Sequence, residues 1–237
     1  MNNLQIYSIN PLVVIRKLEQ CSINNYVNNR ESDWAFSHLP VIPLLFEETI
    51  NKRNDWTPDY LVKFLYQVWS DNKPDCFEEL LKEKGVEVAR MQLKSRAEKL
   101  VLDFCRELHT FGLLSMNMFF DHVFYEKVSD LSMNLDYSAS LVDNPTEIGV
   151  QASMRYNWND STYDKWKQNR RNAKKENREF EGPLFYLTNK EVKHSICQNT
   201  GVWLFNQKHI DSLIETIRIE IGNDLDVELI GINAKPD

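Results

Sequence analysis

The chain has 237 residues, of which 42% are hydrophobic and 27% charged, so it can bury a full core and has the composition of an ordinary soluble protein. It holds no run of roughly 18 apolar residues, which argues against a membrane-spanning helix, and its first 20 residues lack the pattern of a secretory signal. We therefore expect a cytoplasmic protein with no membrane partner. The four scattered cysteines disfavour both a zinc site and a disulfide framework.

The net charge of −7 argues against nucleic-acid binding, but this charge is unevenly distributed. Residues 163–178 contain seven Lys or Arg and two acids, a local charge of +5, so the rest of the chain sums to −12. The sequence thus predicts a basic patch on an acidic body.

The first part of the chain, residues 1–85, is predicted to be a helical N-terminal portion. The Asn-Pro pair at 10–11 can begin a short helix, and the Thr-Pro pair at 57–58 opens a second one whose apolar residues follow helical spacing. Pro40 and Pro43 are predicted to lie in loops.

A sharper pattern covers residues 86–222 and is followed by a C-terminal tail, residues 223–237. Apolar residues between Leu93 and Phe111 recur at helical spacing, and Gly112 is placed to end that helix. Residues 113–125 are apolar and aromatic enough to form a central strand.

Residues 135–156 read as a hairpin. Residues 143–146 (DNPT) are a turn signal, and the residues that follow alternate strictly between apolar and small or polar side chains. This alternation is typical of a strand with one dry face and one polar face.

The turn suggests a register for this hairpin. If Val142 lies opposite Glu147, then Asp136 lies opposite Ser153 and shares a sheet face with Gln151. A slip of one residue would move Asp136 to the other face. The simpler alternatives are a turn or cap role for Asp136 and a solvated strand position for Gln151.

The remaining segments complete an α/β order. Asp160 can cap the basic helix, residues 183–188 and 201–205 are predicted strands, and an apolar stripe from Ile210 to Ile221 indicates a final helix. From residue 86 the order is helix, three strands, helix, two strands, helix, which predicts a mixed sheet between helices.

This order, with an acid entering the second strand and a polar pair on the third, resembles the core of the PD-(D/E)XK nuclease superfamily. That superfamily includes many restriction enzymes, resolvases and transposon end-cutting nucleases. The resemblance covers residues 86–221 and implies a restriction-endonuclease-like core. The family acid matches Asp136, the acid-x-lysine motif falls on residues 151–153, and Glu98 sits where some members carry a glutamate on the first core helix.

The resemblance implies a catalytic site with Mg²⁺ or Mn²⁺, because a metal-dependent phosphodiesterase holds a hard cation on oxygen ligands beside the scissile phosphate. Asp136 and Glu98 would supply carboxylates, and Gln151 an uncharged amide oxygen. Ser153 stands where the family usually has lysine and supplies no positive charge. Arg155, about 7 Å further along the strand, replaces that lysine only if its side chain reaches back.

The basic helix is the second candidate for function. Lys167, Arg171, Lys174 and Arg178 recur at helical spacing and form one positive stripe. Such a stripe can follow a phosphate backbone, and it comes directly after the strand that carries Gln151. A solvated helix without any partner is the alternative explanation of the same charges.

Together these patterns predict a metal-dependent DNA endonuclease of restriction, defence or mobile-element type. A double-strand break would require it to act as a homodimer or with a protein partner. The alternative is a catalytically silent relative that binds nucleic acid or a protein partner, because Gln151 and Ser153 depart from the family motif. An unrelated structural or assembly protein is the third hypothesis, while Asp136 with Glu98 favours an enzyme.

Overall fold

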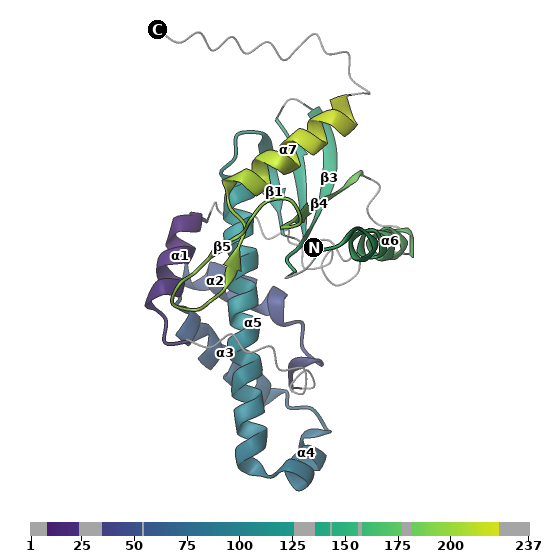
Figure 1. The fold of residues 1–237 in the computed structure, drawn as a ribbon. Coiled ribbons are helices and arrows are strands. Elements are labelled where there is room, and N and C mark those ends of the chain that lie inside the picture. Colours follow the sequence, from purple (N-terminus) through teal and green to yellow (C-terminus); the bar gives the residue numbers. More distant parts are fainter. Residues whose placement is uncertain are drawn as a thin grey trace.

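The computed structural model of the chain describes residues 9–23, 35–53, 55–125, 136–142, 144–155, 158–176 and 182–222. Within these residues the chain forms seven helices, a four-stranded sheet and a separate two-stranded sheet (Figure 1). The helices are α1 (Pro11–Gln20), α2 (Val41–Lys52), α3 (Pro58–Asp71), α4 (Phe77–Lys84), α5 (Val86–Ser115), α6 (Asp160–Glu176) and α7 (Gln207–Gly222). The strands are β1 (Phe120–Phe124), β2 (Tyr137–Leu141), β3 (Asn144–Ser153), β4 (Leu184–Thr188), β5 (Ser195–Ile196) and β6 (Trp203–Leu204).

Two predicted helix starts are confirmed, each by a side-chain cap followed by a proline. Asn10 Oδ1 accepts a hydrogen bond from the N–H of Leu12 at 2.9 Å at the start of α1. Thr57 Oγ1 accepts one from the N–H of Tyr60 at 3.1 Å at the start of α3. Each cap satisfies an N–H group that the first turn of a helix leaves without a partner.

The loop prediction for Pro43 is wrong, because Pro43 lies buried in the first turn of α2. Proline is tolerated there, since the N–H groups of a first turn have no acceptor within the helix. Pro40 stands just before this helix, as the residue that precedes its first turn.

Gly112 does not end the long helix, since α5 continues to Ser115, and the strand predicted over 113–125 is limited to β1. Gly112 instead allows a close approach between chain segments. A Cβ atom at this position would collide with the carbonyl oxygen of Ile9 and lie 3.1 Å from Cδ of Pro11. The glycine therefore lets the start of α1 pack directly on α5.

Helix α5 is the central element of the fold. It contacts α1, α2, α3 and α4, and it also contacts β1, β6 and α7 (Figure 1). Buried side chains of the N-terminal helices and of the sheet belong to one continuous hydrophobic cluster that runs along α5. The described parts of the chain thus share a single core.

The predicted mixed sheet is confirmed, with strand order β1-β2-β3-β4. The pairs β1–β2 and β2–β3 are antiparallel, whereas β3 and β4 are parallel and are joined through α6. Residues 201–205 do not add a fifth strand to this sheet. Their central part, β6, pairs instead with β5 in the separate two-stranded sheet.

Both faces of the sheet are covered at its centre. Tyr137 of β2 packs towards α5, where its ring lies 6.4 Å from that of Phe111. On the other face, Tyr186 of β4 pairs with Gln151 and contacts Trp166 of α6 at 5.2 Å between ring centroids. Gln151 is only 2% exposed, so it does not occupy a solvated strand position.

Candidate functional site

The hairpin β2–β3 pairs in a register two residues away from the predicted one. Ser140, rather than Val142, lies opposite Glu147. The turn is tighter than expected, since Leu141 pairs with Asn144, and a shift of register between Leu141 and Ser140 then brings Glu147 opposite Ser140. A slip of two residues leaves every side chain on its original face.

In the observed register Asp136 lies beside Gln151 rather than Ser153. Its Oδ2 atom accepts a hydrogen bond from Nε2 of Gln151 at 2.8 Å and one from the backbone N–H of Ala152 at 2.6 Å. Hydrogen bonds to a carboxylate are among the stronger ones in proteins. The buried amide of Gln151 therefore acts as a donor that fixes the orientation of Asp136.

Asp136 lines a cavity of about 140 Å³ between α5 and the ends of β2 and β3. The lining residues are Arg106, Glu107, Thr110, Asp136, Tyr137, Ala152, Ser153, Met154 and Phe205. The cavity thus brings together two acidic residues, one guanidinium-bearing residue and two residues with aliphatic hydroxyls. Asp136 and Ser153, both predicted site residues, share it.

The hydroxyl of Tyr137 connects the strand to the helix at this cavity. It donates a hydrogen bond to the carbonyl oxygen of Glu107 at 2.9 Å. Burial raises the pKa of Tyr137 well above its usual value, and the negative charges of Glu107 and Asp136 raise it further. Both carboxylates therefore act on the same hydroxyl.

Glu98, predicted to join Asp136, is not among the residues that line the cavity. It lies near Lys94, with 3.8 Å between the ammonium nitrogen and Oε1. Its charge acts on Tyr66, whose pKa is raised to about 12, mainly by burial. Glu107, nine residues or about 13 Å further along α5, is the acid of this helix at the cavity.

Arg155 is placed away from the cavity, with its Cζ atom 5.0 Å from the ring centroid of Trp158. The cation that lines the cavity is Arg106, which pairs with Asp103 at 3.0 Å. The helix, rather than the strand, thus provides the positive charge at this site. Sequence spacing offered no signal for this, since Arg106 and Glu107 look like ordinary helix-surface charges.

The acidic residues of the cavity bear on the predicted metal site. Among the described residues, no group of three or more His, Cys, Asp or Glu could hold a metal ion. Mg²⁺, however, is often bound through one or two carboxylates, with water and substrate phosphate as further ligands. Asp136 and Glu107 are the two acidic residues in the lining, whereas Gln151, predicted as a ligand, directs its N–H towards Asp136.

Of the predicted basic stripe, the structure describes one side chain. Lys167 is half-buried on α6, and its ammonium lies over the rings of Tyr163 and Tyr186. Arg171 and Lys174 lie on α6, but the structure describes only their backbone. Arg178 lies outside the described residues.

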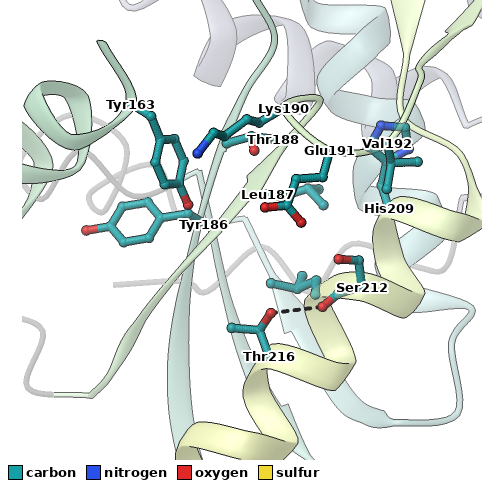
Figure 2. A pocket seen from close by; sticks show the side chains of 11 residues that line it. Tyr163, Tyr186, Leu187, Thr188, Lys190, Glu191, Val192, His209, Ser212 and Thr216 are labelled. Carbon is teal, nitrogen blue, oxygen red and sulfur yellow. Dashed lines mark hydrogen bonds between the residues drawn. The ribbon is translucent and has the colours of Figure 1, made fainter. Parts of the chain in front are cut away.

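A second cavity, of about 120 Å³, lies between the end of β4, α6 and α7. Figure 2 shows the ammonium of Lys190 beside the ring of Tyr163 on one side of it, and Ser212 and Thr216 of α7 on another. Glu191 is the one acidic residue in its lining, so this cavity lacks the acidic pair found beside Asp136.

Comparison with protein-family models, with curated proteins and with solved structures found no match to this chain. In the described part of the chain, no helix is long and apolar enough to cross a membrane.

Proposed function

We propose that this chain is a metal-dependent DNA endonuclease with a PD-(D/E)XK-like core, of restriction, defence or mobile-element type. The observation that carries the proposal is that Asp136, at the start of β2, and Glu107, on α5, line one cavity together with Ser153. The strand order adds support. Three antiparallel strands followed by a helix and a parallel fourth strand agree with the resemblance of the sequence to this superfamily.

Asp136 and Glu107 are the residues that would hold the metal, so that Glu107 takes the role first expected of Glu98. When bound, Mg²⁺ or Mn²⁺ activates water and screens the charge that develops on the phosphate. Gln151 and the N–H of Ala152 keep the Asp136 carboxylate in one orientation. Arg106 places a positive charge beside the cavity, where it stabilises the negative charge of a phosphodiester.

The test is cleavage of supercoiled plasmid in Mg²⁺ or Mn²⁺ by the wild-type chain and by Asp136→Ala, Glu107→Ala and Glu98→Ala. We expect the first two substitutions to lower the cleavage rate by about 10²-fold or more, the scale seen when one charge-stabilising group is removed from an active site. Glu98→Ala is the matched control, because it removes the same group from the same helix outside the cavity. Equal activity of Asp136→Ala and wild type would assign the cleavage to another site.

One observation favours a second function, that of a catalytically silent module which binds nucleic acid or a protein partner. Gln151 donates its N–H to Asp136, where a further metal ligand was expected, and Ser153 brings no charge. Binding of DNA without cleavage, in either metal and by every variant, would support this function and exclude the endonuclease.

A further inference from the structure

Three cations and four aromatic rings gather where β3 and β4 end and α6 begins. Arg155 lies 5.0 Å from the ring centroid of Trp158. Lys190 lies 4.5 Å from the ring centroid of Tyr163, and Figure 2 shows these two side chains beside each other. Lys167 lies between two rings, 5.2 Å from Tyr163 and 5.1 Å from Tyr186. Trp166 packs against the same rings. We call these seven residues the aromatic–cation cluster.

Two of these cations keep their charge uncancelled by a neighbouring acid. A ring face attracts a cation but leaves its net charge in place. In the described part of the chain, neither Arg155 nor Lys167 forms an ion pair with a carboxylate. Lys190 does pair with Asp160 at 2.8 Å, but the Asp160 side chain is 89% exposed. The cluster is therefore suited to an anionic ligand.

Asn189 holds the exposed part of the cluster in place. Its Oδ1 accepts hydrogen bonds from the backbone N–H of Arg155 at 3.0 Å and from Nε1 of Trp158 at 2.8 Å. Its Nδ2 donates to the carbonyl oxygen of Arg155 at 2.9 Å. One side chain after β4 thus fixes two residues after β3, which lowers the conformational entropy lost when a ligand binds.

We infer that the aromatic–cation cluster binds the phosphodiester backbone of a nucleic acid strand that passes the cavity. This inference rests on the proposed function. Arg155 follows Ser153, the last residue of β3 and a residue of the cavity lining, by two residues, so a nucleic acid strand that contacts Arg155 passes close to the cavity. A guanidinium binds a phosphate through two hydrogen bonds, and the ammonium of Lys167 adds a second point of contact.

The test measures binding of fluorescent single-stranded and duplex DNA by anisotropy, in EDTA, at several salt concentrations. Relative to wild type, Arg155→Ala/Lys167→Ala should bind more weakly. Its log-log salt slope should be less steep by about 1.8 on duplex and by about 1.4 on single-stranded DNA, or about 0.9 and about 0.7 for each lost phosphate contact. Lys165→Ala is the matched control, because Lys165 is an exposed lysine of α6 that lies over no ring in the described residues. It should leave the slope unchanged, whereas Asp160→Asn should strengthen binding by releasing Lys190.

The outcomes separate this inference from the endonuclease proposal. An unchanged slope in the double variant, an equal loss in Lys165→Ala, or no binding of either DNA by wild type would overturn the inference. Binding that depends on Arg155 and Lys167 without any plasmid cleavage would leave it standing and overturn the endonuclease. If plasmid cleavage depends on Asp136 but the double variant binds DNA as wild type does, the endonuclease proposal stands and the inference about the aromatic–cation cluster is overturned. Weaker binding of either form of DNA by the double variant, with the shallower slope, supports the inference, and the comparison of the two forms shows which is preferred.

Discussion

Replacing Gln151 by Glu tests the hydrogen bond that orients Asp136. The amide nitrogen that lies 2.8 Å from Asp136 Oδ2 becomes a carboxylate oxygen, at a position where the native side chain is 2% exposed. Two carboxylates about 4 Å apart repel each other by about 4 kcal/mol at the effective dielectric constant of about 20 that suits protein sites. The variant can relieve this repulsion by keeping one proton.

Keeping that proton makes the stability of Gln151→Glu depend on pH. A glutamate has a pKa of about 4.3 in the unfolded chain, so holding its proton at pH 7 costs about 3.7 kcal/mol, and at pH 5 about 1 kcal/mol. The folded-state pKa is raised, hence the loss of stability grows as the pH rises above the unfolded value. We expect the variant to be less stable than wild type by 3 to 4 kcal/mol (roughly) at pH 7 and by about 1 kcal/mol at pH 5.

The assay is urea unfolding of wild type, Gln151→Glu and Gln151→Leu at both pH values. Gln151→Leu removes the hydrogen bond without adding charge, so its loss of about 1.5–3 kcal/mol should be the same at pH 5 and pH 7. Millimolar Mg²⁺ at pH 7 should stabilise Gln151→Glu more than it stabilises wild type or Gln151→Leu, since a cation bound between the two acids favours the folded state. A pH-independent loss in Gln151→Glu would refute the contact between Gln151 and Asp136.

Two further predictions concern α5. Gly112→Ala should gain about 1 kcal/mol of stability from helix propensity but lose about 1–3 kcal/mol because the new Cβ collides with the carbonyl of Ile9. We therefore expect calorimetry to show a lower Tm than that of wild type. A higher Tm would contradict the close approach of Ile9 to Gly112. Burial lowers the pKa of His109 to about 4, below its unfolded value of about 6.5, so the unfolded state binds the proton more tightly. The stability present above pH 6.5 should fall by about 3 kcal/mol towards pH 4. In urea unfolding His109→Phe should lack this dependence, and an identical pH profile in both proteins would assign it to other groups.

The shared face of Asp136 and Gln151 could be predicted, because the period-two alternation of a strand survives a slip of two residues. Their direct contact could not be predicted, since it depends on the tight turn and on the register shift after Ser140, which no residue pattern signalled. The hydrophobic stripes placed α5 and α7 correctly for a similar reason, as burial periodicity is a local property of the sequence.

The sequence predicted Glu98, rather than Glu107, as the acidic residue of α5 at the site. Helical spacing gives the direction of a side chain around the helix axis, but it does not give the position along the axis at which the sheet packs. Glu98 and Glu107 both lie next to the buried stripe, and only the packing of Tyr137 on Glu107 selects between them. Gly112 was predicted to end the helix, but a glycine is needed there because the carbonyl oxygen of Ile9, about a hundred residues earlier in the chain, lies against it. Contacts between distant segments are not encoded in any local pattern.

Helix α5 also determines how cooperatively the protein unfolds. Its 30 residues, about 45 Å long, pack against the N-terminal helices and against the sheet within one core. If either the N-terminal helices or the sheet separated from α5, apolar surface of α5 would be exposed and the packing of the other would weaken. We therefore expect the N-terminal helices and the sheet to unfold together, in a single two-state transition. α4, none of whose side chains is buried, is the element that can open separately, and amide hydrogen exchange there should be fast while that of α5 approaches the global limit.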